Sequence, residues 1–246
     1  MIVIILAAGK GTRMNSDIAK VLHTIHGKTL LQYVNDLAHK INPERIFVVV
    51  GFQKDNVIKT LKSDKVEFIN QEKQLGTGHA VKQVIPHLGD YDEEILVLPG
   101  DVPFLSENSL NKLLQTHRLH NAAITLLTTE KEKPTGYGRI LRNNNNRIEK
   151  IVEEDDCSNS EKSIKEVNAG IYCFNKNFLL EFLGKMNKNN TQQEYYLTDM
   201  VKIACKVPLR IMSVRVRIPM KFMGLIQKKL LRKHKNFIVM IFIAKT

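Results

Sequence analysis

The fold is decided by the stretch that opens the chain, Ile2-Val3-Ile4-Ile5-Leu6-Ala7-Ala8-Gly9-Lys10-Gly11-Thr12-Arg13-Met14. Its first five residues are apolar and four of them are β-branched, which predicts a strand buried on both faces. The glycines that follow predict a turn at the carboxyl end of this strand, where an open α/β sheet binds its ligand. Gly9 and Gly11 let backbone N–H groups come close to a polyphosphate, and Lys10, Arg13 and Lys20 add positive charge. The stretch therefore predicts a loop that binds the phosphates of a nucleotide.

Two better-known glycine-rich loops do not fit this stretch. A Walker loop needs Gly, four further residues and then Gly-Lys-Ser/Thr, but no glycine precedes Ala7 here and Lys10 comes before the second glycine. The third glycine of the dinucleotide fingerprint would fall at Met14. What remains, Leu-Ala-Ala-Gly-x-Gly-Thr-Arg-Met, resembles the signature of the sugar-nucleotide pyrophosphorylases. The alternative is an ordinary connection between a strand and a helix with incidental basic residues.

Strand-like and helix-like segments alternate after the loop. The alternation predicts an α/β fold with a doubly wound, mostly parallel, Rossmann-like sheet. The resemblance to the pyrophosphorylases implies the form of this fold that is found in nucleotide-diphospho-sugar transferases. Ser106 is expected to cap the helix that carries Leu110, Leu113 and Leu114. The other expected elements are strands over 2–6, 46–50, 66–69 and 95–98, and helices over 30–38, 57–61 and 80–88.

The pattern changes after about residue 120. We interpret this portion as an antiparallel sugar-binding extension of the same sheet and not as an independent domain. Its expected elements are strands over 123–128, 147–152 and 167–174, a loop over 134–138, a turn over 143–146 and a helix over 178–183.

The net charge of +12 is concentrated in the last segment of the chain. Residues 207–246 contain ten Lys or Arg and no Asp or Glu, whereas residues 1–206 carry 27 basic and 25 acidic side chains. A nearly neutral body argues against a nucleic-acid-binding protein. Three cysteines without Cys-x-x-Cys spacing and no signal peptide favour the cytoplasm. The longest apolar run, 237–244, is too short to span a membrane.

Two further motifs carry polar groups at the ends of expected strands. Gln71 has an amide that can pair with a pyrimidine edge, and Gly76-Thr77 opens a helix with free N–H groups. The segment Leu98-Pro99-Gly100-Asp101 ends a strand in a carboxylate that can hold Mg²⁺ against phosphate oxygens. For the first motif, an ordinary helix cap would explain the glycines but would not explain Gln71. For the second, a single Gly-Asp pair after a strand is common in proteins of other functions.

Taken together and in this order, the three motifs resemble the uridyltransferase domain of the bifunctional N-acetylglucosamine-1-phosphate uridyltransferases/glucosamine-1-phosphate acetyltransferases. Later segments share the resemblance, which covers roughly residues 1–206: Thr135 to Ile140, Ile151 to Glu153, Val167 to Gly170 and Glu194 to Asp199. It implies uridylyl transfer from UTP to N-acetylglucosamine 1-phosphate, which gives UDP-N-acetylglucosamine and pyrophosphate for cell-wall precursor synthesis.

The resemblance also implies the roles of individual residues. Arg13 and Lys20 would be the catalytic groups on the phosphates, and Asp101 would be a Mg²⁺ ligand. The implied nucleotide-binding residues are Leu6, Ala7, Ala8, Gly9, Lys20, Gln71, Gly76, Thr77 and Gly100, and the implied sugar-binding residues are Gly138, Glu153, Asn168 and Thr198.

The sequence departs from this family in three respects. Pro99 replaces the usual Tyr or Ser, a change that we expect to be tolerated. The acetyltransferase β-helix is absent, so acetylation is not expected and the oligomeric state is open. The family segment that closes the domain and gives Mg²⁺ a second ligand is not found after Lys206.

We therefore divide the chain into a nucleotidyltransferase domain, 1–213, and an atypical basic tail, 214–246, and we hypothesise that the tail results from a reading-frame shift. Codons can be chosen for residues 218–227 such that the same bases, read in the frame that starts one base earlier, encode Asp-Pro-Asn-Glu-Val-Tyr-Gly-Ile-Asn-Thr. This peptide resembles the missing family segment. Activity would then be impaired. The alternatives are a pyrophosphorylase for glucose 1-phosphate, a cytidylyltransferase, or an inactive remnant whose basic tail binds anionic surfaces.

Overall fold

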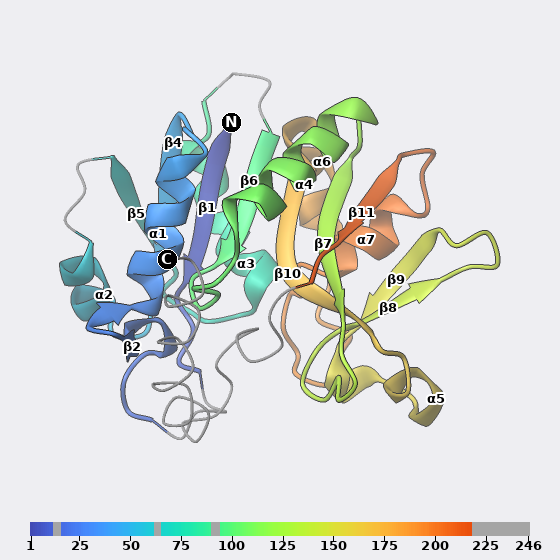
Figure 1. Cartoon of the computed structure of the whole chain (residues 1–246), viewed down its shortest axis with the longest axis horizontal. Helices are drawn as coiled ribbons and strands as arrows, with labels where there is room; N and C mark the ends of the chain where they lie inside the picture. The colour runs from blue at the N-terminus through green and yellow to red at the C-terminus, as the bar shows by residue number, and fades with distance from the viewer. Residues whose placement is uncertain (12–15, 62–64, 90–93, 218–246) are drawn as a thin grey trace, which may run out of the picture.

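The computed structural model describes residues 1–11, 16–61, 65–89 and 94–217. One nine-stranded sheet runs through the described residues in the order β11-β7-β10-β6-β1-β4-β5, and β8 and β9 branch from β10 (Figure 1). Its strands are β1 (Ile2–Ala7), β4 (Arg45–Val50), β5 (Val66–Asn70), β6 (Glu94–Pro99), β7 (Ile124–Glu130), β8 (Arg139–Arg142), β9 (Ile148–Val152), β10 (Glu166–Asn175) and β11 (Ile211–Arg215). A small hairpin pairs β2 (Thr24–Ile25) with β3 (Lys28–Thr29).

The predicted doubly wound fold is confirmed, because helices cover both faces of a central sheet whose strands β5, β4, β1 and β6 are parallel. The helices are α1 (Leu30–Lys40), α2 (Lys54–Thr60), α3 (Thr77–Val84), α4 (Glu107–Leu119), α5 (Asn159–Lys162), α6 (Lys176–Phe182) and α7 (Asp199–Ala204), with short 3-10 turns at Lys20–Leu22, Ile85–His87, Glu154–Asp156 and Leu183–Lys185.

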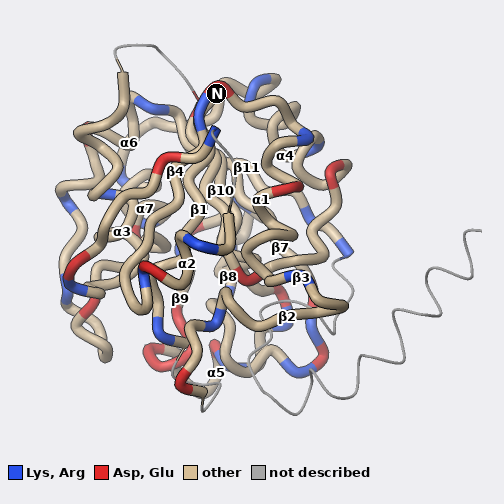
Figure 2. Tube along the Cα trace, turned by 90° about the vertical axis from the view of Figure 1, so that its left-hand side faces the viewer, with Lys and Arg blue, Asp and Glu red and all other residues tan. Residues whose placement is uncertain are grey.

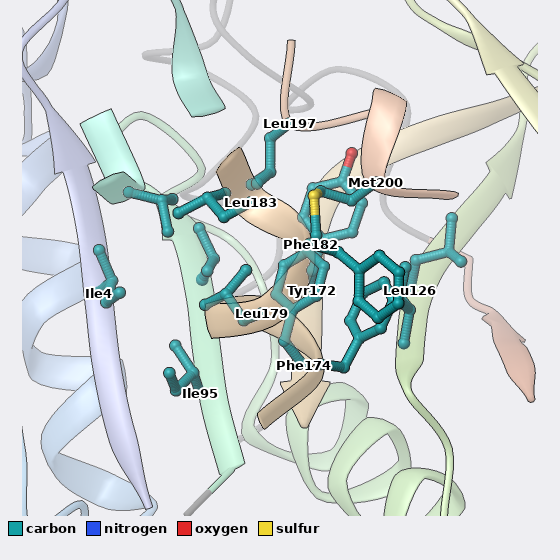
Figure 3. Packing of buried hydrophobic residues seen from close by; sticks show 14 of the residues in the cluster. Ile4, Ile95, Leu126, Tyr172, Phe174, Leu179, Phe182, Leu183, Leu197 and Met200 are labelled. Carbon is teal, nitrogen blue, oxygen red and sulfur yellow. The ribbon is translucent and has the colours of Figure 1, made fainter. Parts of the chain in front are cut away.

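Strand β1 is buried on both faces, as its apolar sequence predicts. Val3 and Ile5 pack in the layer that contains α1, α2 and α4, whereas Ile2 and Ile4 pack in the layer that contains α3, α6 and α7. Figure 3 shows the second layer, in which Tyr172, Leu179 and Met200 come together from β10, α6 and α7. Successive side chains of a strand point to opposite faces, so one apolar run serves both layers.

The helix ends follow local sequence signals. Ser106 caps α4 by accepting a hydrogen bond from the Ser109 N–H, as predicted. Thr29 and Gln32 form a reciprocal capping box at the start of α1. The helix expected over 80–88 instead begins at Thr77 and changes to a 3-10 turn after Val84, where Pro86 has no N–H for the helical ladder.

Strand β10 joins the two parts of the sheet. It lies antiparallel between β6 and β7, and it also pairs with β8 of the β8–β9 hairpin. Its register shifts between Asn168 and Tyr172, where Gly170 adopts a φ of +75° that favours glycine. The antiparallel extension therefore belongs to the main sheet, as predicted, and two of its strands, β7 and β10, have neighbours on both sides in that sheet.

Strand β11 was not predicted, and the expected boundary between residues 213 and 214 falls within it. The strand runs parallel to β7 through the pair Arg215 and Thr128, and the Val216 N–H donates to the Thr128 carbonyl at 2.9 Å. The carboxylate of Glu166 on β10 accepts from Arg142 at 2.7 Å and from Arg215 at 3.1 Å. Residues 214–216 therefore extend the sheet, while 218–246 lie outside the described residues.

Charge is mixed over the described part of the molecule. Figure 2 shows Lys and Arg interspersed with Asp and Glu along the trace, in keeping with the near balance of charge in residues 1–206. Among the described helices, none combines the length and the apolar character needed to span a membrane.

Candidate active site

The site begins where β1 and β6 end side by side. The Gly100 N–H donates to the Leu6 carbonyl at 2.9 Å, and a Cβ at position 100 would lie 2.9 Å from that same oxygen. Glycine is therefore required here, because a side chain could not be accommodated between two backbones this close. The contact places Gly100, which directly follows β6, beside the end of β1, where Ala7 ends the strand and Ala8 and Gly9 begin the loop; Asp101 is the next residue after Gly100.

Lys20 forms an ion pair with Asp101 at this edge of the sheet. Lys20 begins a 3-10 turn, and the Ala19 N–H before it donates to the Gln53 side-chain oxygen at 2.9 Å. Gly11 has a φ of +71°, and a Cβ there would lie 2.6 Å from the Lys20 Cβ. The glycine-rich loop thus packs directly on the lysine that the sequence assigned to the phosphates. Arg13 lies outside the described residues.

Gln71 lies beside the same loop and is almost fully buried, with 3% of its surface exposed. Gly51 separates it from Ala8: a Cβ at position 51 would come 2.9 Å from the Gln71 carbonyl and 3.0 Å from the Ala8 Cβ. The Gln71 side-chain nitrogen donates to the Gly76 carbonyl at 3.1 Å. The predicted nucleotide residues of the first two motifs are therefore brought together.

The Gly76-Thr77 turn is held by a segment more than a hundred residues further along the chain. The Gly78 N–H donates to the Tyr195 carbonyl at 2.8 Å, and the Leu197 N–H donates to the Thr77 hydroxyl at 3.0 Å. Thr77 starts α3, and the Tyr195 carbonyl thus satisfies one of the N–H groups in the first turn of that helix.

The predicted sugar residues also lie together, on the antiparallel side of the sheet. The Thr198 hydroxyl donates to the Glu153 carboxylate at 3.1 Å. A Cβ at position 138 would lie 3.3 Å from another oxygen of Glu153, and the Asn168 N–H donates to the Gly138 carbonyl at 2.9 Å. The Asn168 side chain donates to the Tyr172 hydroxyl and accepts from the Gly170 N–H, so its amide is fixed.

The nucleotide side and the sugar side meet at Tyr137 and at Gly170. Burial, together with the charge of Asp101, raises the pKa of Tyr137 to about 12, so the phenol stays protonated beside the carboxylate. A Cβ at position 170 would lie 3.2 Å from the Pro99 ring. One edge of the sheet thus presents a carboxylate, a lysine, a buried amide and a second group of polar residues.

A family model described as Nucleotidyl transferase matches residues 2–213 of this chain. The chain belongs to the nucleotidyl transferase family. Proteins with the name "Bifunctional protein GlmU" are similar to it: that of Cyanothece sp. is 51% identical over 198 residues, which cover 80% of this chain and 44% of the relative. The protein of Streptococcus mutans is 46% identical over 200 residues, which cover 81% and 43%.

The alignment with the relative from Rippkaea orientalis reaches further, with 43% identity over 228 residues, or 92% of this chain and 49% of the relative. The chain spans less than half of the length of these curated relatives. The resemblance to the uridyltransferase domain of this family is thereby confirmed.

Sequence reasoning missed several residues of this nucleotidyl transferase that support the site. Tyr137 was assigned only to a loop, and His79 was given no role, although it contacts Gln71. Tyr195 holds the turn at Gly76 through backbone hydrogen bonds, and these cannot be read from the type of side chain. A signal for His79 was present, because it lies in the first turn of the helix that follows Gly76.

Replacing Gly76 with alanine should destabilise the fold by about 1–3 kcal/mol, the usual range for a residue forced into a disfavoured backbone region. Its φ is +106°, and a Cβ there would lie 2.5 Å from the Tyr195 carbonyl. Urea denaturation measures the change. Gly184→Ala is the matched control, since a Cβ at that position meets nothing within 4 Å. An equal effect of the two substitutions would show that the turn tolerates a side chain.

Proposed function

We propose that this chain catalyses uridylyl transfer from UTP to N-acetylglucosamine 1-phosphate. The observation that carries the proposal is the meeting of the two residue sets: Gly100 and Asp101 contact Leu6 and Lys20, and across from them Glu153 is bonded to Thr198. A site for one small molecule would not need both sets. The similarity to proteins named GlmU supports the amino sugar as the acceptor.

In the proposed reaction a phosphate oxygen of N-acetylglucosamine 1-phosphate attacks the α-phosphorus of UTP in line, and pyrophosphate leaves. Such a transfer requires positioning and charge neutralisation more than covalent help from the protein. Lys20 supplies positive charge beside the Gly9–Gly11 loop, and Arg13 of the same loop is proposed to add more. No nucleophilic side chain is needed.

The residues around Asp101 fit a magnesium ion that is shared with the substrate. Among the described residues no cluster of three or more His, Cys, Asp or Glu could hold a metal by itself. Mg²⁺ in nucleotide enzymes is commonly held by one or two carboxylates together with substrate phosphates, so the single carboxylate of Asp101 is compatible with it. When bound, the ion would neutralise phosphate charge, and Lys20 would exchange its pairing with Asp101 for the phosphates.

An assay that crosses nucleotides with sugar phosphates tests the proposal. UTP with N-acetylglucosamine 1-phosphate should release pyrophosphate with a kcat/KM at least about tenfold above that for glucose 1-phosphate or for CTP. Preference for glucose 1-phosphate or for CTP would assign the chain to the alternative pyrophosphorylases or cytidylyltransferases. Salt-dependent binding to anionic vesicles without turnover would favour an inactive remnant.

The three cysteines are free in the structure, which is compatible with a reducing compartment. We therefore retain the cytoplasm as the proposed location. UTP and N-acetylglucosamine 1-phosphate are the proposed partners.

We further propose that the chain after Arg217 is read in a shifted frame. The pairing of Arg215 with Glu166 and of Val216 with Thr128 supports a junction after these residues instead of at 214. Replacing 218–246 by the shifted-frame translation should raise kcat at least about tenfold, because it would return a Mg²⁺ ligand supplied by that segment. Unchanged kcat in the replaced chain, or codons that give no family segment in either shifted frame, would refute the frame shift.

A further inference from the structure

His79 contacts the side chain of Gln71 directly. Its Nδ1 lies 3.0 Å from the Gln71 side-chain nitrogen, and its ring stacks on Tyr195 with centroids 6.3 Å apart. His79 also lies on α3, whose first turn follows Gly76. The imidazole thus lies between the Gln71 amide, which is proposed to bind the base, and Tyr195, whose backbone holds the Gly76-Thr77 turn.

The orientation of the Gln71 amide follows from its other partner. The atom 3.1 Å from the Gly76 carbonyl oxygen must be the NH₂ group, because a carbonyl oxygen only accepts hydrogen bonds. One N–H of this group donates to Gly76 and the other donates to His79 Nδ1. Both donors are then used, and within the described parts of the chain no hydrogen bond reaches the amide oxygen. The oxygen is therefore the atom left for a ligand.

We propose that His79 is a positioning residue that holds the Gln71 amide with its oxygen toward the base and so makes the site select uracil over cytosine. The proposal rests on the proposed function, in which Gln71 reads the base. Uracil presents an N–H donor at N3, which an amide oxygen can accept. Cytosine presents a bare N3 acceptor, which would face the same oxygen without a proton between them. A locked amide therefore discriminates, whereas an amide free to turn over could serve both bases.

The hydrogen-bond pattern also sets the protonation state of His79. Accepting at Nδ1 requires a neutral ring with its proton on Nε2, and Gln83 lies 3.2 Å from Nε2. The Gln83 side-chain nitrogen is the atom at this distance, and it also donates to the His79 carbonyl at 3.1 Å. Accepting the Nε2 proton therefore requires the half-buried Gln83 amide to turn over and give up that bond, so that the Gln71 amide can keep its bond to Gly76. A protonated ring would direct a second N–H at the Gln71 NH₂ group and break the arrangement.

The surroundings of His79 favour the neutral ring. Burial, and then the charges of Lys82 and Lys188, lower the pKa of His79 below its ordinary value. Lys82 shares α3, while Lys188 lies over the Tyr195 ring at 4.8 Å on the facing segment. Burial raises the pKa of Glu194 on that segment, so at mildly acid pH less negative charge is present there to offset the positive charge of the lysines.

The strands beneath α3 add no further charge beside the imidazole. Their charged residues on this side, Arg45 of β4 and Glu67 of β5, pair with each other at 2.8 Å near the amino ends of the strands, away from Gln71. His87 follows α3 in the next turn, and its carbonyl accepts from Arg45. Lowering the pH through the depressed pKa of His79 should therefore weaken uridine binding, with the neutral ring active above it.

Two variants of His79 separate its hydrogen bond from its bulk. His79→Asn keeps an acceptor near the Nδ1 position and cannot titrate, whereas His79→Leu removes the acceptor. The ratio of kcat/KM for UTP to that for CTP should fall at least about tenfold in His79→Leu and stay within about threefold in His79→Asn. Unfolding in urea, measured for both variants, shows whether either has lost its fold. If His79→Leu does not fold, the pH profile of His79→Asn tests the proposal on its own.

UDP-N-acetylglucosamine is the probe for the pH profile, because both of its phosphates are esterified and do not titrate between about pH 5 and pH 8. Calorimetry should show wild-type affinity falling at least about threefold toward pH 5, and affinity of His79→Asn that does not change with pH. A wild-type ratio and profile in both variants would overturn the proposal. If Gln71→Ala also keeps the discrimination, the proposed base-reading role of Gln71 fails instead, and with it that part of the proposed function.

Discussion

Replacing Asp101 with asparagine should lower kcat by about a hundredfold to a thousandfold, the range seen when a group that stabilises transition-state charge is removed. An amide is a far weaker Mg²⁺ ligand than a carboxylate, and the variant also leaves Lys20 without its negative partner. The measurement is steady-state pyrophosphate release over a range of Mg²⁺ concentrations, in which half-saturation should move to higher Mg²⁺.

Asp36→Asn is the matched control for this substitution. Asp36 forms an ion pair with Lys28 on an exposed face, so the same chemical change is made away from the proposed site. Its kcat should equal that of the wild type. If Asp101→Asn kept both the wild-type kcat and the wild-type dependence on Mg²⁺ concentration, Asp101 would not be a Mg²⁺ ligand.

Replacing Arg13 with alanine should lower kcat by about a hundredfold or more and change the substrate KM much less. Arg13 follows Gly11, which packs on Lys20, by two residues in the sequence, and we expect its charge to act on the phosphates as negative charge moves to the leaving pyrophosphate. Stopped-time assays with both substrates varied give kcat and KM separately.

Lys10→Ala provides the comparison within the same loop. The Lys10 ammonium lies 5.6 Å from the centre of the Phe52 ring, so we expect its charge to contribute to binding of the phosphates more than to the transition state. Its removal should leave kcat within about threefold of the wild type. A raised KM at constant kcat in Arg13→Ala would instead assign Arg13 to binding of the ground state.

The parts of the fold that the sequence predicted are those with a strong local signal. The apolar run 2–6 and the helical spacing in 30–38 correspond to β1 and α1, and Ser106 caps α4. Strand β11 has only five residues, and its partner β7 lies more than eighty residues earlier. No periodicity marks such a strand, because its stability comes from pairing with distant residues and from the Glu166 ion pairs.

The residues of the candidate site also divide into those with a local sequence signal and those that depend on distant contacts. Gln71, Asp101 and Lys20 stand at strand ends or in loops, so their position in the sequence indicates where they lie in a parallel sheet. Backbone clamps such as that of Tyr195 on Gly76 depend on tertiary contacts alone. The position of His79 beside Gln71 likewise required the geometry of the turn before α3.

The place of β10 between β6 and β7 has a consequence for the order of folding. Both neighbours precede it in the chain, so β6 and β7 cannot be joined until residues 166–175 have been synthesised. A nascent chain that is still shorter than this can form the β5, β4, β1 and β6 half with Gln71 and Asp101, but it lacks Asn168 and the strand that holds the halves together. The nucleotide half can thus assemble during translation, and insertion of β10 joins β7 to that half and brings Asn168 to it before β11 adds the edge strand.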